Sequence, residues 1–505
     1  MESIRIKNLR CLKDTGDIVL KPITMLVGTN SSGKSTFLRT FPLFKQGTNV
    51  NKQGPILWYG AEVDFGSFHE AIRRGEETME FSFKWGQLSV ETYYTLSLHT
   101  VILEDVQCTV KIVREGEDAF VKELHIDLFG DLQIDIVFLK TKVNLSVNGR
   151  KMAKEKGFNI MQRSSARSIL PIISVDIPNE SSFFNPIPFS LVQNSIGNIP
   201  HFNKIFKKIK KEETFFPKLS TQKEMLSNVC QHYEVEYDES ILSDPHWQQY
   251  SDIVTYANLQ GITDTIERTL QQEFSSVYYI KPFRASAERY YRQQNLAVRD
   301  LDSDGHNMAM FVDNMFKDPT IEEKFCTWTQ ENFDFIIRPV RQGGHLSIAI
   351  IDRVSQRNTI KEEDYRNMTD KGFGYSQILP IILTLWQIFS NSPNKNTLKR
   401  TTFAVYEQPE LHLHPKMQAE LMDAIISTTK AAMRKNVDVK FIIETHSSVM
   451  INRLGLRVAL DNEMLSNMTS VLLFDENNEN SPNISEFNAN GRLTNWPIGF
   501  FEPDL

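Results

Sequence analysis

Residues 23–36 read ITMLVGTNSSGKST, a short apolar run that leads into the spaced pattern Gly28-x-x-x-x-Gly33-Lys34-Ser35. In a phosphate-binding loop, backbone N–H groups of a glycine-rich turn and the N-terminus of the next helix face the phosphates. We expect Lys34 to reach the β- and γ-phosphates of a nucleotide and the Ser35 hydroxyl to bind Mg²⁺. The alternative is a chance match, which the flanking strand and helix patterns disfavour. The residues expected to contact the nucleotide are Asn30, Gly33, Lys34, Ser35 and Thr36.

The composition is that of an ordinary globular protein with two or three domains. The chain has 505 residues, of which 41% are hydrophobic and 24% charged, and a net charge of −7. A negative net charge excludes a wholly basic surface, so a contact with DNA or RNA would need a local patch. The cysteines lack metal-ligand spacing and predict reduced thiols in a cytoplasmic protein. No signal peptide is expected, and no apolar run reaches the roughly 20 residues that span a bilayer.

The pattern of apolar residues predicts an ATPase core with an insertion. Alternating apolar and polar residues from Phe65 to about Val147 predict an antiparallel β meander. A polar, charge-rich region then predicts a helical arm, and wholly apolar short runs after it predict buried parallel strands. The predicted fold class is therefore α/β, with a P-loop core, a parallel or mixed sheet, the β meander and the inserted arm. The expected domains are an N-terminal core part at 1–176, the arm at 177–275 and a C-terminal core part at 276–505.

Three further motifs lie in the C-terminal part. Residues 371–377, KGFGYSQ, precede an apolar helix and predict either a second anion-binding helix start or a glycine turn with a serine cap. Residues 403–410, FAVYEQPE, predict a buried strand that brings Glu407 to Mg²⁺. Residues 441–448, FIIETHSS, predict a second buried strand. We expect His446 after it to contact the γ-phosphate; the alternative is a core histidine.

The histidines that follow the acid strand allow two interpretations. Glu410, His412 and His414 are candidate zinc ligands, because alternate residues share one face of an extended segment. No fourth ligand is evident in the sequence, and the segment directly follows the Mg²⁺ strand. We therefore favour a loop without zinc.

The order of these motifs resembles the ABC-type ATPases of the RecF, SMC and OLD group. The resemblance implies that Gly374, Ser376 and Gln377 form a signature segment that reaches the nucleotide of the opposite subunit. It therefore implies a head-to-tail dimer or a higher oligomer, with ATP and Mg²⁺ as cofactors. It also implies that Glu407 is the Walker B acid and His446 the switch histidine.

Within that group, three segments look like the PtuA ATPase subunit of Septu anti-phage systems, some of which are linked to retrons. They are WYGAEVDFGSF at 58–68, PFRASAERYY at 282–291 and NWPIGFF at 495–501. The resemblance implies a sensor and regulatory scaffold that controls a separate HNH-type nuclease, with DNA or retron RNA/DNA as further candidate partners. It places His412–Pro415 in the D-loop and leaves the Q-loop glutamine open between Gln46 and Gln53.

The residue after the Walker B acid departs from the pattern of many relatives, which carry a second acid there as general base. Gln408 can orient a water molecule but cannot accept its proton, and general-base catalysis is typically worth about 10²–10⁴ in rate. We therefore expect slow hydrolysis, since phosphoryl transfer depends mainly on positioning and charge. Glu410 is the alternative base. The residues expected to act in catalysis are Glu407, Gln408 and His446.

No nuclease domain is expected in this chain, because no acid cluster or HNH-like spacing follows His446. Two alternatives to the regulatory ATPase remain open: a RecF-like DNA-repair ATPase that clamps DNA without a toxic effector, and an autonomous enzyme.

Two basic segments are candidate partner surfaces. The first is expected on an arm helix, where a solvated face is the favoured interpretation and a nucleic-acid or acidic-partner contact the alternative. The second is expected to be a structural turn of the core. The segments are Lys204, Lys207, Lys208, Lys210 and Lys211, and Arg284, Arg289, Tyr290, Tyr291 and Arg292.

Overall fold

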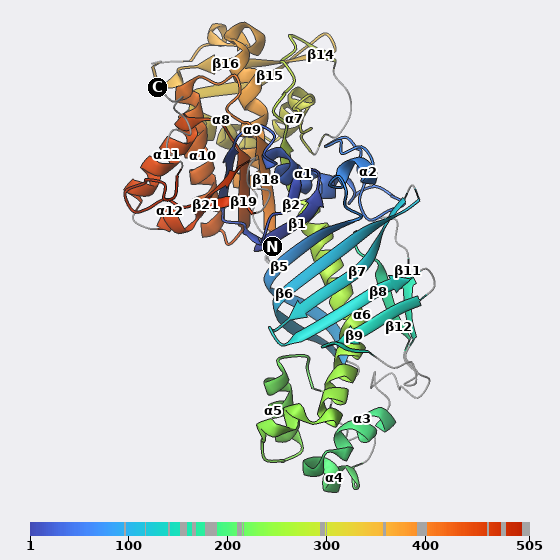
Figure 1. Ribbon diagram of the computed structural model, residues 1–505. Helices are drawn as coiled ribbons and strands as arrows, with labels where there is room; N and C mark the ends of the chain where they lie inside the picture. The colour runs from blue at the N-terminus through green and yellow to red at the C-terminus, as the bar shows by residue number, and fades with distance from the viewer. Residues whose placement is uncertain are drawn as a thin grey trace. The chain divides into compact units, whose positions relative to one another are not determined.

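The chain folds into two compact units that are interleaved in sequence (Figure 1). Unit 1 contains Met1–Val19 and Leu43–Ser275, and unit 2 contains Leu20–Pro42 and Ser276–Leu505. The structure is a computed structural model. It describes residues 1–94, 97–116, 118–139, 142–151, 159–163, 168–176, 189–209, 215, 217–292, 298, 300–356, 360–390, 401–461, 464–475 and 481–496.

Unit 1 is built on a nine-stranded sheet with the order β10-β9-β8-β7-β6-β5-β1-β2, and β3 pairs with β1. Consecutive strands from β5 to β10 pair antiparallel, which confirms the predicted meander. The strands are β1 (Ser3–Leu9), β2 (Leu12–Asp14), β3 (Ile18–Val19), β5 (Thr78–Tyr94), β6 (Ser97–Glu115), β7 (Asp118–Leu128), β8 (Leu132–Leu139), β9 (Lys142–Val147) and β10 (Arg150–Lys151).

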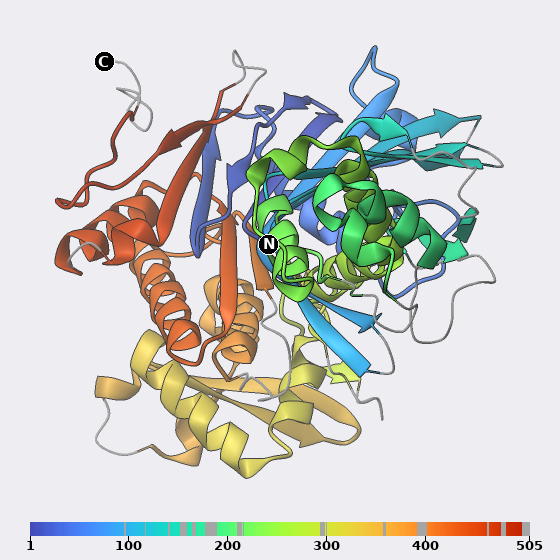
Figure 2. The same cartoon turned by 90° about the horizontal axis from the view of Figure 1, so that it is seen from below.

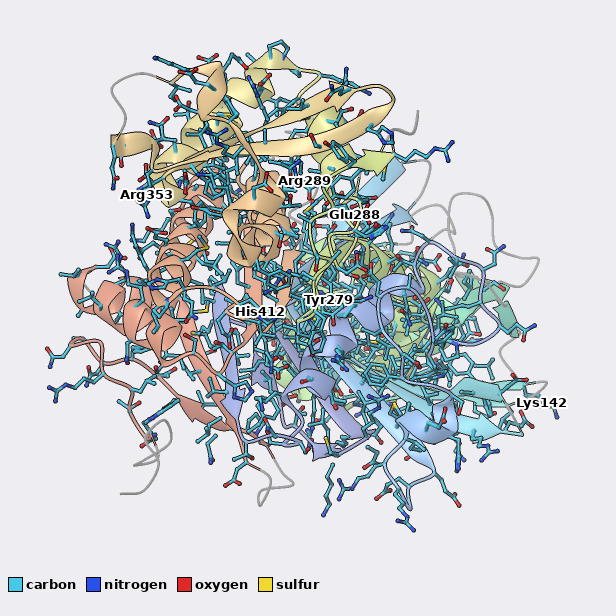
Figure 3. The ribbon with its side chains drawn as sticks, turned by 90° about the horizontal axis from the view of Figure 1, so that it is seen from above. Lys142, Tyr279, Glu288, Arg289, Arg353 and His412 are labelled. Atoms are coloured by element: carbon cyan, nitrogen blue, oxygen red, sulfur yellow. The ribbon has the colours of Figure 1, made fainter. Side chains whose placement is uncertain are left out.

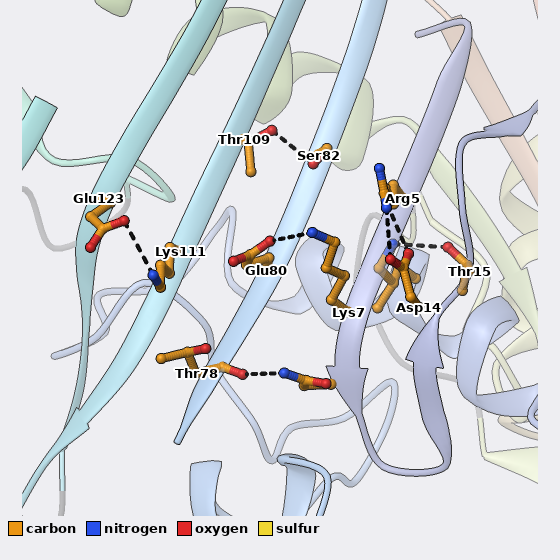
Figure 4. A network of polar contacts seen from close by, with 12 residues as sticks. Arg5, Lys7, Asp14, Thr15, Thr78, Glu80, Ser82, Thr109, Lys111 and Glu123 are labelled. Carbon is orange, nitrogen blue, oxygen red and sulfur yellow. Dashed lines mark hydrogen bonds and ion pairs between the residues drawn. The ribbon is translucent and has the colours of Figure 1, made fainter. Parts of the chain in front are cut away.

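The alternation of side chains gives this sheet one apolar face and one polar face. In β8, Leu132, Ile134, Ile136 and Phe138 are buried, while the residues between them are more exposed. Polar side chains on neighbouring strands pair across the sheet, as Figure 4 shows for one network. The pairs are Arg5–Asp14, Lys7–Glu80, Lys111–Glu123 and Ser82–Thr109.

The helices of unit 1 fall mainly in the expected arm. Helix α6 has buried residues along its whole length and packs against β5 and β12. The elements are α2 (Phe68–Ala71), the hairpin β11 (Asn159–Arg163) and β12 (Ile172–Asp176), α3 (Phe189–Ser195), α4 (Pro200–Phe206), α5 (Gln222–His232) and α6 (Pro245–Ser275).

Where the structure describes the basic run of the arm, only its first lysine, Lys204, is helical. Helix α4 ends at Phe206, and Lys207 and Lys208 lie in the turn that follows. The expectation of a helix carrying all these lysines is therefore wrong for the described part. Lys210 and Lys211 lie outside the described residues.

Unit 2 is built on a six-stranded sheet with the order β13-β18-β19-β4-β20-β21. The first five strands are parallel, and β21 pairs antiparallel at the edge. Figure 2 shows β4 from the N-terminal part of the chain between strands of the C-terminal part. The strands are β4 (Ile23–Gly28), β13 (Val277–Ile280), β18 (Thr401–Glu407), β19 (Asp438–Glu444), β20 (Thr469–Phe474) and β21 (Asn483–Ser485).

These parallel strands are apolar because helices cover the sheet. All six residues of β4 and of β20 are buried, and one large hydrophobic cluster joins the strands to α9, α10 and α11. The helices are α1 (Lys34–Gln46), α7 (Met308–Met315), α8 (Pro319–Phe333), α9 (Phe373–Ser390), α10 (Pro415–Arg434), α11 (Ser448–Leu460) and α12 (Met464–Asn467).

A second, antiparallel sheet completes unit 2, with the order β14-β16-β15 and β17 on β16. The fold class is α/β, as predicted. Unit 2 resumes at Ser276, directly after the expected arm, but the functional division at residues 176 and 275 stays a prediction. No helix in the described ranges is long and apolar enough to cross a membrane. The strands are β14 (Tyr291–Arg292), β15 (Phe335–Gln342), β16 (His345–Asp352) and β17 (Arg366–Asn367).

Candidate nucleotide-binding site

The phosphate-binding loop runs from the end of β4 to the start of α1, as the sequence predicts. Gly28 has φ +148°, and a Cβ at this position would lie 2.1 Å from the carbonyl oxygen of Phe474 on β20. Gly33 has φ +105° and Ser31 φ +65°, so the turn depends on left-handed backbone. Asn30 is exposed, whereas Gly33 is buried. The loop is thus held against a neighbouring strand with no room for a side chain at its first glycine.

Lys34 lies folded against the loop that it follows. Its Nζ donates to the carbonyl oxygens of Gly28 at 3.0 Å and Thr29 at 2.6 Å. The side chain is buried, and burial lowers the pKa of Lys34 while the nearby Glu444 carboxylate opposes that shift. A cation is therefore concentrated at the loop, where the pattern predicts nucleotide phosphates. Loop, lysine and helix start fit a phosphate group.

Two acids end neighbouring strands beside the loop. Glu407 closes β18, Glu444 closes β19, and the two are aligned in the parallel register. β19 is also the direct neighbour of β4, so Glu444 is the nearer of the two to the loop strand. The Ser35 hydroxyl donates to Oε1 of Glu444 at 2.9 Å. Glu444 was not among the expected site residues. The segment FIIE nevertheless carries the same pattern as FAVYE, a run of three or four apolar residues followed by an acid.

Glu407, the expected Walker B acid, is fully engaged by two partners. Arg39 on α1 binds it in a fork, with Nε 3.0 Å from Oε2 and Nη2 2.6 Å from Oε1. The hydroxyl of Tyr279 on β13, labelled in Figure 3, donates to Oε2 at 2.7 Å. The Glu407 carboxylate raises the pKa of Arg39, so the guanidinium stays charged. The negative charge of Glu407 is thus balanced inside the unit.

Glu444 has a different environment. Burial raises the pKa of Glu444 to about 7, the hydrogen bond from Ser35 opposes the shift, and the Glu407 charge adds to it. Its Oε2 is buried and has no hydrogen-bond partner among the described residues. A buried carboxylate without a balancing partner is energetically costly unless a cation or a proton reaches it.

The segment after β18 has strained backbone at two non-glycine residues. Gln408 has φ 45° and His412 has φ 63°. The N–H of Gln408 donates to the Glu444 carbonyl at 2.9 Å, which ties this turn to the neighbouring strand. Such strain persists only where the surroundings determine the conformation, and it gathers at functional sites.

Glu410 links this turn to the end of β19. Its Oε1 accepts the N–H of His446 at 2.7 Å, and burial raises the pKa of Glu410. Partial burial lowers the pKa of His446, with a further contribution from the charge of Lys34. A neutral imidazole therefore lies within electrostatic reach of the loop lysine, where a γ-phosphate sensor is expected. That role stays a prediction.

The residues expected to form the signature segment lie at the start of α9. This helix begins at Phe373, and the Ser376 hydroxyl donates to the Phe373 carbonyl at 2.7 Å, so the serine-cap interpretation is wrong. Ser376 and Gln377 are buried, and Gln377 donates to the Arg284 carbonyl at 3.4 Å. Gly374 is half-buried. The exposed residue here is Phe373, whose ring meets that of His412 edge-on at 5.0 Å.

The remaining candidates have structural partners. The Nδ1 of His414 caps α10 by accepting the N–H of Lys416, and the described residues hold no cluster of three or more His, Cys, Asp or Glu that would bind a metal. His412, labelled in Figure 3, lies in the loop before α10. Gln46 donates to the Leu57 carbonyl at 2.6 Å, and Gln53 is exposed. Neither glutamine is thereby identified as the Q-loop residue.

In the second basic segment Arg284 and Tyr291 are buried, whereas Arg289, Tyr290 and Arg292 are exposed, so the prediction of a structural core turn is confirmed only for the two buried residues. Arg284 is buried and donates to the carbonyls of Pro409 and Leu411, and burial lowers the pKa of Arg284 to about 10. Arg289 pairs with Asp370. Arg284 therefore holds the turn after β18 in place.

The site lies entirely in unit 2. It consists of the phosphate-binding loop, two acids at the ends of adjacent parallel strands, and the polar residues that follow β19, among them His446. These features define a P-loop ATPase of the α/β class. The family model of the AAA ATPase domain matches residues 1–451, and the chain belongs to that family.

A curated protein and several solved structures are similar to this chain. Endonuclease GajA of Bacillus cereus (strain HuB5-5) is 33% identical over 85 residues, which are 16% of this chain and 12% of that protein. The chain thus matches only a small part of that relative. The SMC head domain from Thermotoga maritima is 8% identical, with 96% of this chain and 98% of that chain covered and a TM-score of 0.31. The RecF–ATP structure of the RecFOR pathway is 10% identical, with 96% and 98% covered and a TM-score of 0.28. The assignment does not depend on these distant structures.

Proposed function

We propose that this chain is an ATP-binding, slowly hydrolysing ATPase that acts in the cytoplasm as the sensor and regulatory scaffold of an anti-phage defence complex. The observation that carries the proposal is Gln408, which stands after the Walker B strand where a general base is expected. An ATPase without that base holds ATP for long periods, so the bound state serves as a signal.

ATP binding is supported by the loop itself. Lys34 is positioned to exchange its two carbonyl partners for phosphate oxygens, and Asn30, Gly33, Ser35 and Thr36 surround the same turn. Ser35 and one of the two aligned acids that end β18 and β19 would hold Mg²⁺. When bound, the ion would neutralise charge on the β- and γ-phosphates.

Slow hydrolysis is supported by the surroundings of the expected water position. The amide of Gln408 orients a water molecule but takes no proton from it. Glu410, the alternative base, already accepts the His446 N–H and is buried. His446 would contact the γ-phosphate and report its presence.

The proposed effector is a separate HNH-type nuclease subunit. The similarity to a protein named an endonuclease supports a link to nuclease chemistry, and it covers 16% of this chain. Self-association in a head-to-tail dimer or higher oligomer is proposed through the start of α9, and DNA or retron RNA/DNA are proposed as further ligands.

The first experiment is purification of the tagged chain from its own operon, with mass analysis of every co-eluting component. A nuclease subunit at fixed stoichiometry is the expected result. A lone protein that binds DNA with ATP would favour the second candidate, a RecF-like DNA-repair clamp. ATP binding is measured in parallel with Lys34→Ala, which should abolish it. A kcat on the order of 10 s⁻¹, the ordinary enzyme value, would contradict the slow-ATPase proposal.

A further inference from the structure

We infer that Glu444, rather than Glu407, supplies the carboxylate that faces the Mg²⁺ of the bound nucleotide beside Ser35. The inference rests on the proposed function, since it requires that the loop bind a Mg²⁺–nucleotide. It assigns Glu407 a positioning role, which it performs through its ion pair with Arg39.

The first argument is position. A P-loop serine that binds Mg²⁺ through its oxygen keeps a hydroxyl proton, which a neighbouring carboxylate can accept. In this chain the acceptor is Glu444, whose Oε1 lies 2.9 Å from the Ser35 Oγ. β19 lies between β18 and β4, so the strand order brings Glu444 to the loop and places Glu407 one strand farther away.

The second argument is the availability of oxygen atoms. Both oxygens of Glu407 already accept strong hydrogen bonds from Arg39, and one also accepts from Tyr279. A metal ion that bound to Glu407 would have to displace the guanidinium of Arg39, which contacts both oxygens of the carboxylate. Oε2 of Glu444 is buried and, within the described ranges, accepts no hydrogen bond.

The third argument is charge. Arg39 balances Glu407, whereas the charge of Lys34 acts on Glu444 only at a distance, because the Lys34 Nζ donates to the loop carbonyls. Mg²⁺ is bound in nucleotide sites by one or two carboxylates together with phosphate oxygens and water. A single desolvated carboxylate beside Ser35 meets that requirement, and the ion would supply the positive charge that Glu444 lacks.

The test compares two matched variants, Glu444→Gln and Glu407→Gln, which change equivalent positions of paired strands. The affinity for a fluorescent ATP analogue is measured with EDTA and with saturating Mg²⁺, and Mn²⁺ bound to the protein–nucleotide complex is followed by electron paramagnetic resonance. Glu444→Gln should keep the metal-free affinity and lose about 10–100-fold of the affinity for the metal. Glu407→Gln should keep the increase in nucleotide affinity that Mg²⁺ gives. It should unfold at a lower denaturant concentration, because Arg39 loses its charged partner.

The opposite pattern, or an equal loss of the Mg²⁺ gain in both variants, would overturn the inference. Circular dichroism checks that each variant is folded. If Glu444→Gln does not fold, Glu444→Asp replaces it: the shorter side chain keeps the charge and should weaken Mn²⁺ binding, and an unchanged Mn²⁺ affinity would overturn the inference. Failure of the wild-type chain to bind nucleotide with or without Mg²⁺ would instead contradict the proposed function.

Discussion

Glu407 and Glu444 show how similar local sequences acquire different chemistry. Each acid ends a buried strand, and the two are paired in register. Arg39, contributed by α1, neutralises the first, while Ser35 offers the second only a neutral hydroxyl. The partner on the helix, not the strand pattern, decides which carboxylate is balanced and which is left for a cation.

Gln408 provides the residue-scale test of the catalytic proposal. Gln408→Glu should raise kcat by about 10²-fold or more, because a carboxylate can accept the proton of the attacking water. The side chain keeps its length, and glutamate meets the same backbone requirement at φ 45°. Steady-state phosphate release measures the rate, with Gln408→Ala as the control that should not gain. An unchanged rate in Gln408→Glu would show that proton transfer does not limit turnover.

Lys52 gives a pH-dependent stability that is separate from the nucleotide site. Burial lowers the pKa of Lys52 to about 8, against an ordinary value of 10.5. The unfolded chain therefore binds this proton more tightly, so Lys52 makes the free energy of unfolding rise between pH 8 and about 10, by on the order of 3 kcal/mol. Below pH 8 both states hold the proton, so the cost of burying the charged amine is present in full and no longer changes with pH.

The measurement for Lys52 is urea unfolding at several pH values of wild type and Lys52→Met. Between pH 8 and about 10, the free energy of unfolding of wild type should increase relative to that of the variant as the pH rises. A constant difference would contradict the lowered pKa.

Strand order is the decisive feature at the scale of elements. Because β4 lies between β19 and β20, the loop meets Glu444 on one side and the Phe474 carbonyl on the other. The turn after β18 is tied to β19 through Gln408 and Glu410. The site is therefore formed by four adjacent strand ends, those of β18, β19, β4 and β20, and by α1, which follows β4.

Gly28 tests this close contact between elements. Gly28→Ala would place a Cβ 2.1 Å from a backbone oxygen that cannot move aside, so we expect a loss of at least about 2 kcal/mol of stability together with weaker ATP binding. Thermal unfolding and nucleotide titration measure both effects. Gly343→Ala is the control, since Gly343 has positive φ but nothing within 4 Å of an added Cβ. Equal losses in the two variants would indicate backbone strain alone.

For the whole molecule, the chain passes between the two units three times, after Val19, Pro42 and Ser275. β4 and the start of α1 come from the N-terminal part but complete the sheet of unit 2. Unit 2 consequently holds every expected site residue, including those of α9. An assembly that joins two nucleotide sites would use the exposed start of that helix.

Phe373 offers the cleanest test of pairing. Ser376→Arg would also disturb folding, because Ser376 is 3% exposed, whereas Phe373 is 48% exposed. Phe373→Arg should block ATP-dependent dimerisation and leave monomer ATP binding intact, as read by analytical ultracentrifugation and nucleotide titration. Leu460→Arg, another exposed apolar position, is the control that should still pair. Dimers of Phe373→Arg at wild-type affinity would place the interface elsewhere.

The sequence by itself determined the phosphate-binding loop, the α/β class, the β meander and two apolar strands, one that ends in Glu407 and one that lies just before His446. These are local patterns of spacing and alternation, which the chain carries wherever it folds. Only the tertiary structure decided that Arg39 balances Glu407, that Glu444 meets Ser35, that Ser376 is buried and that α4 ends before Lys207 and Lys208. Those facts depend on which strands become neighbours in the sheet and on which side chains are buried. The order β18-β19-β4 cannot be read from any local sequence pattern.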